Sequence, residues 1–363
     1  MVCGTENLTI YYTYIPYNED GWTIFNIQQI GYYRVNYDKE NWKRIRNYLN
    51  SRNYKNIHVL NRAQIIDDAF NLMIAGHLNC SIFWDITSYL YQEEDYIAWY
   101  PMFKALEYIC NTFPVMKEEI AYMAQLISDT LNYVLKKIKY EEIGDVDELR
   151  ICLRQEAARW ACLLNHINCK REANNQLKQH FQDPSKHELL PWWKEWTYCN
   201  ALKINSDKLI REAVSVEVSD AKFLEYLACS EDTNTINHYL TYEPYTKEQY
   251  QYFRYSFLHI ITKHANNQAI LKNILNAFFF YVKPKQIDVP IALIIMINNV
   301  YSVNLTQEIN KYVKWVKNNT DINYGVKGRD FLEKNLDKIE SKITIRNNQI
   351  KRQIELYYDW FYF

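Results

Sequence analysis

Glycine is scarce in this chain, with only 7 among 363 residues. Tight hairpins, phosphate-binding loops and dinucleotide-binding fingerprints all depend on glycine, because it alone adopts positive φ angles at little cost. Proline is also rare, at 8 residues, whereas 48% of the residues are hydrophobic. The sequence therefore predicts a folded and mostly helical chain, and it disfavours the nucleotide-binding folds.

The charge balance and the hydropathy argue against two further classes of protein, those that bind nucleic acid and those that insert into a membrane. Lys plus Arg total 42 and Asp plus Glu total 43, so there is no basic field to attract nucleic acid. Residues 1–17 lack the basic start and apolar core of a secretory signal, and the longest apolar candidate, residues 291–296, is too short to cross a bilayer. We expect no nucleic-acid partner and no membrane insertion by these residues.

Three segments near the N-terminus have the composition of strands. Residues 8–13, 22–27 and 31–37 are rich in β-branched and aromatic side chains. Two or three strands cannot bury both faces of a sheet by themselves. The prediction is that residues 1–40 are the terminal strands of a truncated β-sandwich, which either lie on the helical body or lack their partners.

From residue 41 to residue 363 the pattern is helical, which predicts one long helical domain. Asn61 is expected to cap a helix, with Gln64 at the spacing of a capping box, and Gly76 is expected to end it. Helices of about 10–18 residues with short links predict antiparallel pairs stacked into a curved α-solenoid of the HEAT or armadillo kind. Further helices are expected from Tyr100 onward and at residues 118–138, 149–164, 209–216, 221–228, 249–264, 271–282, 291–303, 305–317 and 331–345.

No complete catalytic motif is visible. His187-Glu188-Leu189-Leu190-Pro191 begins like the zinc motif His-Glu-x-x-His, but Pro191 cannot supply the second ligand. We interpret this segment as a polar loop before a helix. His259 and His264 are five residues apart, about 500° around a helix, so they point in different directions. We therefore predict neither catalytic nor metal-binding residues in this chain.

Two carboxylate clusters remain, Asp67-Asp68 and Glu93-Glu94-Asp95. A general acid and base need a cleft and opposed environments, and the sequence shows neither. Because carboxylates are seldom buried, we expect both clusters on exposed faces or at helix caps.

The eight cysteines have no metal-ligand spacing. In a reducing compartment they are expected as buried thiols, whereas in an oxidising one Cys162 could pair with Cys169 and Cys199 with Cys229; spacing alone leaves the pairing open. Four Asn-x-Ser/Thr sites are candidate glycosylation acceptors, although a chain this rich in asparagine supplies some by chance. These are Asn7, Asn79, Asn304 and Asn318.

Several segments resemble the zinc-dependent aminopeptidases of the aminopeptidase N and endoplasmic-reticulum aminopeptidase type. Residues 31–38 read Gly-Tyr-Tyr-Arg-Val-Asn-Tyr-Asp, and residues 61–70 read Asn-Arg-Ala-Gln-Ile-Ile-Asp-Asp-Ala-Phe. Weaker matches continue at residues 96–101, 198–200, 227–230 and 360–361. The resemblance covers roughly residues 20–363 and corresponds to the C-terminal helical region of that family.

The resemblance implies a C-terminal domain that caps a peptide chamber, with zinc held by a catalytic domain that these residues lack. It implies disulfides Cys162–Cys169 and Cys199–Cys229 and an extracellular or membrane-associated location. Arg329 matches a recurrent family arginine and is a candidate peptide-facing residue; its alternative is a solvated residue at a helix start. The expected partners are the catalytic domain or another protein, and peptides.

Two hypotheses follow. The first is a non-catalytic C-terminal capping domain of a zinc aminopeptidase, the family that releases N-terminal amino acids from peptides. The second is a stand-alone helical solenoid that binds a protein partner and has no peptidase role. An active aminopeptidase formed by these residues alone is disfavoured, because a zinc hydrolase needs three ligands and a base that activates water.

Overall fold

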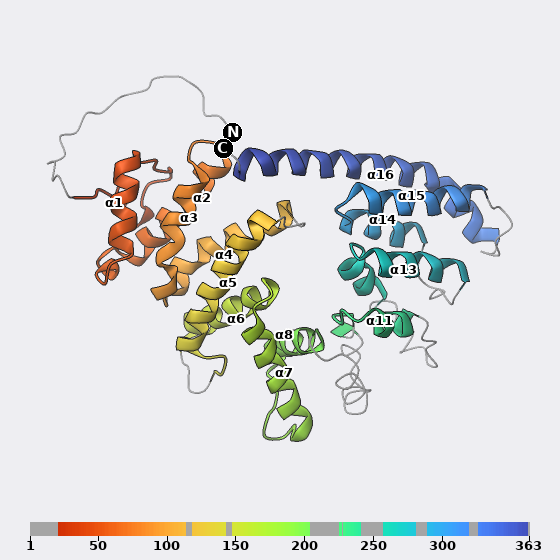
Figure 1. Ribbon diagram of the computed structural model, residues 1–363, viewed down its shortest axis with the longest axis horizontal. Coiled ribbons are helices and arrows are strands. Elements are labelled where there is room, and N and C mark those ends of the chain that lie inside the picture. The colour runs from red at the N-terminus through yellow and green to blue at the C-terminus, as the bar shows by residue number, and fades with distance from the viewer. Residues whose placement is uncertain are drawn as a thin grey trace. The chain divides into compact units, whose positions relative to one another are not determined.

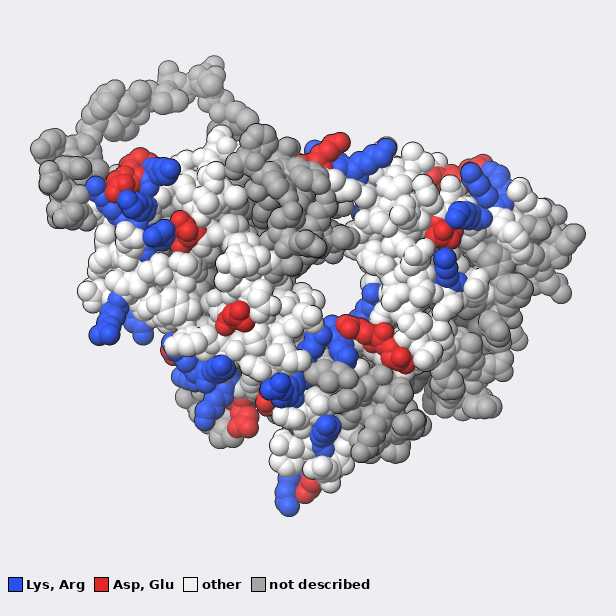
Figure 2. All heavy atoms as spheres, viewed as in Figure 1, with Lys and Arg blue, Asp and Glu red and all other residues white. Residues whose placement is uncertain are grey.

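The computed structural model describes residues 21–113, 118–142, 147–203, 225–226, 228–240, 257–280, 289–318 and 326–361. Helices dominate these residues, and none of them lies in a β-strand (Figure 1). The predicted mostly-α, solenoid-like class is confirmed. On the face shown in Figure 2, cationic and anionic side chains are interspersed, in keeping with their nearly equal numbers of 42 and 43.

The described residues fall into two compact units. The first contains residues 21–93 and 97–102, and the second contains residues 94–96 and everything from residue 103 onward. The boundary predicted after residue 40 stays a prediction, since residues 1–20 lie outside the described part.

The first unit is built on three helices, α1 (Lys39–Leu49), α2 (Val59–Ile74) and α3 (Cys80–Thr87). Short 3-10 turns, η1 (Ile27–Gln29), η2 (Tyr54–Asn56) and η3 (Ser88–Gln92), join and flank them. Trp42, Ile45 and Leu49 recur at helical spacing on α1 and are fully buried, as an amphipathic helix requires. Both α1 and α2 pack against α3.

The strands predicted at residues 22–27 and 31–37 are wrong. These residues form bends, irregular backbone and η1, while residues 8–13 lie outside the described part. β-Branched and aromatic residues favour a strand only where a second strand can accept and donate backbone hydrogen bonds. No such partner strand is present among the described residues.

Side chains of α1 and α2 bind this segment in place of a partner strand. Backbone amides that no neighbouring strand pairs still need acceptors, and here polar residues of the two helices supply them for three half-buried amides. The pairs are Thr23 N to Asn41 Oδ1 (2.9 Å), Gln28 N to Asn61 Oδ1 (3.0 Å) and Val35 N to Asp68 Oδ2 (3.1 Å).

Replacing Asp68 with alanine should free the Val35 amide. We expect this amide to exchange with deuterium at least about tenfold faster, because hydrogen bonds to charged groups stabilise by about 1.5–3 kcal/mol. Asp67→Ala is the matched control, since Asp67 pairs with Arg34 rather than with the Val35 amide. Equal exchange rates at Val35 in the two variants would show that Asp68 does not hold this segment.

The start of α2 differs from the prediction, whereas its end agrees. His58 rather than Asn61 is the N-cap, with Nδ1 accepting from the Leu60 amide at 3.3 Å. Asn61 lies inside the helix, where Asn61 Nδ2 donates to Gln64 Oε1 at 2.9 Å. Gly76 has φ +74° and follows the C-cap, and the amides of Gly76 and His77 close a Schellman motif on α2.

The second unit contains successive helices that pack in pairs. α5 packs on α6, α7 on α8, and both α14 and α15 on α16. The bounds are α4 (Tyr96–Thr112, which shares residues 97–102 with the first unit), α5 (Glu118–Ile138), α6 (Glu148–Leu163), α7 (Ile167–Gln182), α8 (Pro191–Leu202), α11 (Thr233–Leu240), α13 (Gln268–Phe280), α14 (Val289–Asn299), α15 (Val303–Asn318) and α16 (Val326–Phe361). A further helical segment covers residues 257–264.

The core of this unit is a continuous apolar cluster that extends from Leu177 on α7 to Ile343 on α16. Arg154, which is 1% exposed, closes the C-terminal end of α5 by donating to the carbonyls of Ile138 and Lys139 at 3.1 and 2.9 Å. The predicted helix at residues 209–216 lies outside the described part, as does most of the one at 221–228. Of the helix predicted at residues 249–264, residues 257–264 are described and are helical.

Candidate functional site

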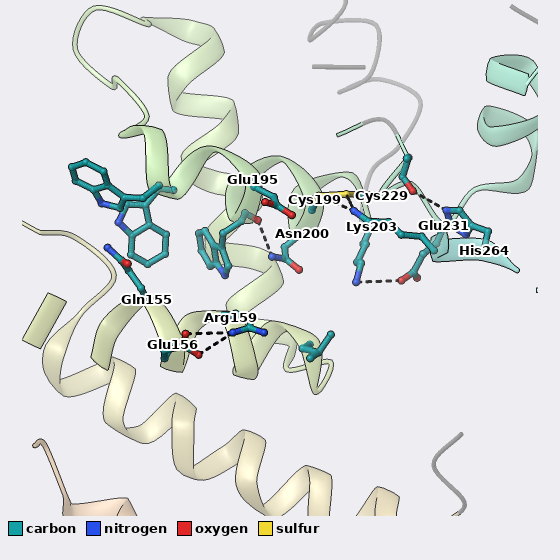
Figure 3. A pocket seen from close by; sticks show the side chains of 16 residues that line it. Gln155, Glu156, Arg159, Glu195, Cys199, Asn200, Lys203, Cys229, Glu231 and His264 are labelled. Atoms are coloured by element: carbon teal, nitrogen blue, oxygen red, sulfur yellow. Dashed lines mark hydrogen bonds and ion pairs between the residues drawn. A yellow bond between two sulfur atoms is a disulfide. The ribbon is translucent and has the colours of Figure 1, made fainter. Parts of the chain in front are cut away.

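A cavity of about 660 Å³ opens within the second unit, between α6, α8, the turn at residues 228–231 and the end of the segment 257–264 (Figure 3). Its size falls within the range of small-molecule and cofactor sites, about 300–1,000 Å³. Its walls combine indole rings, charged side chains and one disulfide.

Tryptophans at the start of α8 form one wall. Pro191 occupies the first position of this helix, where its missing N–H costs nothing. The rings of Trp193 and Trp196 meet edge to face at 4.9 Å, and the indole nitrogen of Trp196 donates to Ala158 O at 3.1 Å. Trp192 is 55% exposed beside them. The wall is therefore apolar and largely fixed.

Charged residues of both signs line the rest of the cavity. Glu156 pairs with Arg159 at 3.2 Å, and Lys203 pairs with Glu231 at 3.7 Å. Burial lowers the pKa of Lys203, and Glu231 opposes that shift. Glu195 adds a third carboxylate. A cavity with paired charges and indoles can bind a ligand that carries both charges and apolar groups.

The far end of the cavity contains Lys263 and His264. Although the Lys263 side chain is exposed as a whole, protein atoms around its ammonium desolvate it and lower its pKa. The Nε2 atom of His264 lies 2.8 Å from Ala228 O, and burial lowers the pKa of His264 and so favours its neutral form. The Ala228 carbonyl and the Glu231 carboxylate oppose this lowering of the pKa of His264.

Two disulfides are present, and they are the pairs that the family resemblance implies. Cys162–Cys169 closes the turn between α6 and α7, with Cα atoms 5.3 Å apart. Cys199–Cys229 joins α8 to the turn at residues 228–231, with Cα atoms 4.9 Å apart, and borders the cavity. Among the described cysteines, Cys80, Cys110 and Cys152 are free thiols.

Comparison with known proteins decides the family. Residues 22–341 match the family model described as the ERAP1-like C-terminal domain. The chain belongs to this family.

Relatives of this ERAP1-like domain are aminopeptidases. Aminopeptidase N of Bos taurus is 25% identical over 361 residues, which cover 94% of this chain and 36% of that protein. Aminopeptidase N of Plutella xylostella is 34% identical over 188 residues, which cover 50% of this chain and 19% of that protein. Membrane alanyl aminopeptidase of Heliothis virescens is 29% identical over 230 residues, which cover 61% of this chain and 22% of that protein. The aligned regions thus span about a fifth to about a third of these relatives.

The segment that resembles a zinc motif is a loop in this ERAP1-like domain, as predicted. The carbonyl of His187 contacts His180 Nδ1 at 2.8 Å, and Pro191 begins α8. His259 is half-exposed near Glu225, whereas His264 is buried, so the two do not converge. Within the described ranges, no three His, Cys, Asp or Glu side chains are grouped as metal ligands.

The expectation that both carboxylate clusters are exposed is wrong for two members. Asp68 is 4% exposed and accepts from the Val35 amide; Glu93 is 1% exposed and pairs with Arg62. The signal that sequence reasoning missed was Arg62 itself, a cation on the largely buried helix α2. A buried cation requires a carboxylate partner.

A buried arginine on α16 was also missed. The guanidinium of Arg346 lies 4.7 Å from the ring centre of Tyr301, and Arg346 Nε donates to Val300 O at 3.0 Å. Burial lowers its pKa, opposed by Tyr301. The Arg346 side chain therefore joins α16 to the segment that follows α14.

The remaining candidates fall on different parts of the domain. Arg329 lies in the first turns of α16, but its side chain is outside the described part, as is the whole of Asn7. Asn79, Asn304 and Asn318 are all exposed, and Asn79 Oδ1 also caps α3 by accepting from the Ser81 amide. None of the helices in the described ranges has the length and apolar content needed to cross a bilayer.

Proposed function

We propose that this chain is the non-catalytic capping domain of a zinc aminopeptidase, and that it closes and shapes a peptide chamber whose zinc site belongs to other residues of the enzyme. The match of residues 22–341 to the ERAP1-like C-terminal domain carries the proposal. The relatives' own names, aminopeptidase N and membrane alanyl aminopeptidase, support the activity of the whole enzyme.

The donor set of this chain does not fit zinc. A catalytic zinc site needs three protein ligands and an open position, and Pro191 stands where His-Glu-x-x-His has its second histidine. What these residues supply is the peptide-binding wall.

The lining of the cavity suits that role. A peptide carries apolar side chains and opposite charges at its ends, and the cavity presents indoles together with Lys203, Lys263, Glu195 and Glu231. We propose peptides as ligands and the catalytic domain as the partner. The name of the Heliothis relative and the two disulfides support an extracellular or membrane-associated enzyme, with Asn79, Asn304 and Asn318 as candidate glycan acceptors.

The alternative, a stand-alone helical module for protein binding, has one observation in its favour. Three amides of residues 22–37, those of Thr23, Gln28 and Val35, donate to side chains of α1 and α2, and no strand edge is exposed in the described part. Such a self-contained end fits a domain that folds without a catalytic partner.

The purified chain, given zinc and alanyl p-nitroanilide, should release no nitroaniline above the buffer rate. The reason is the missing ligand at Pro191. Glu188→Gln provides the control for contaminating peptidase, because any background must be the same in that variant. Zinc-dependent release by the chain that Glu188→Gln abolishes would contradict the non-catalytic role.

A further inference from the structure

The two disulfides have different surroundings. Cys162 and Cys169 are 2% and 0% exposed, so a dissolved thiol cannot reach either sulfur without local opening. Cys199 is partly exposed, and both Cys199 and Cys229 line the cavity. Thiol–disulfide exchange needs access to one sulfur, and the cavity gives access to Cys199.

A lysine distinguishes the two sulfurs of the cavity disulfide. Lys263 Nζ lies 2.6 Å from Cys229 Sγ and 3.6 Å from Cys199 Sγ. A nearby cation stabilises a thiolate, and the more stable thiolate leaves faster in exchange. Cys199 is therefore the accessible sulfur, and Cys229 is the better leaving group.

We propose that Cys199–Cys229 is a thiol-exchange site for a small peptide thiol of the glutathione class. The thiolate of that molecule attacks Cys199 Sγ, the S–S bond breaks, and its electron pair leaves on Cys229 Sγ beside the Lys263 ammonium. The products are a mixed disulfide on Cys199 and a Cys229 thiolate. A second thiol then attacks the mixed disulfide, which releases the oxidised dimer of the thiol and leaves Cys199 reduced.

The cavity provides room and charge for this ligand. Its volume of about 660 Å³ accommodates a tripeptide. Lys203 and Lys263 attract carboxylates, while Glu195 and Glu231 face the amino end. Because the disulfide joins α8 to residues 228–231, its opening releases one wall of the cavity from another.

The order in which the two disulfides open can be measured on the native chain. The chain is treated with increasing concentrations of glutathione and alkylated, and its peptides are then mapped by mass. We expect alkylation at Cys199 and Cys229 at glutathione concentrations that leave Cys162–Cys169 intact, with the glutathione adduct on Cys199. The proposal is overturned if the two disulfides open together, if Cys162–Cys169 opens first, or if the adduct forms on Cys229.

Two lysine variants test the leaving-group assignment. Lys263→Met should slow the opening of Cys199–Cys229 by roughly threefold or more, because it raises the pKa of the leaving thiol. Lys186→Met removes the same charge from the same unit, but Lys186 pairs with Asp183 outside the cavity, so the rate of opening in this variant should stay within about twofold of that in the unsubstituted chain. Equal rates in the two variants would overturn the role of Lys263.

Discussion

Replacing Arg62 with methionine should lower the free energy of unfolding of the first unit by about 3–5 kcal/mol, because it leaves a buried carboxylate without its cation. The Arg62 and Glu93 side chains are 6% and 1% exposed. Arg62 Nε donates to Glu93 Oε2 at 2.7 Å, and a second guanidinium nitrogen donates to Ile57 O at 2.6 Å. Denaturant-dependent hydrogen exchange of the α2 amides measures the loss within this unit.

An exposed ion pair of the same unit provides the control. Arg46 binds Asp85 at 3.1 Å, with side-chain exposures of 39% and 57%, so Arg46→Met should cost no more than about 1 kcal/mol. The double variant Arg62→Met with Glu93→Leu should recover much of the loss, since removing both charges leaves neither unpaired. Equal costs for Arg62→Met and Arg46→Met would contradict the buried pair.

Replacing Tyr198 with alanine should destabilise the second unit by about 3–5 kcal/mol, the cost usual for removing a large aromatic side chain from a core. Tyr198 is 0% exposed, and its ring stacks on Tyr226 with centres 5.0 Å apart and planes 10° apart. It belongs to the apolar cluster that connects α7 and α8 with the later helices. Urea unfolding followed by circular dichroism measures the change.

Trp192 is the matched control on the same helix. It is 55% exposed, so Trp192→Ala should cost less than about 1 kcal/mol. A loss of similar size in both variants would mean that the cluster around Tyr198 does not hold the second unit together.

Local patterns predicted the helices well, because an apolar stripe at helical spacing reports directly on the face that a helix buries. The helix expected at residues 118–138 is α5 with the same bounds, and the stop at Gly76 follows from its positive φ. The length of the last helix was underestimated, since α16 continues to Phe361 whereas the expected helix ends at residue 345.

Contacts between distant residues could not be predicted in this way. Glu93 is 31 residues from Arg62, so no local pattern shows that the two meet. The strand expected at residues 31–37 had suitable side chains, but strand formation depends on a neighbouring strand that sequence composition does not supply. The cavity likewise requires α6, α8 and residues 228–264 to come together.

Fusion of this chain to the catalytic portion of a relative tests the central claim most directly. The first three-quarters of Plutella xylostella aminopeptidase N, joined to this chain in place of the enzyme's own C-terminal region, should hydrolyse alanyl p-nitroanilide with zinc, whereas this chain alone should not. The fusion should also cleave short peptides faster than the catalytic portion alone, because a capping domain completes the peptide chamber. A folded fusion no faster than the catalytic portion alone, or turnover by this chain alone, would contradict the capping role.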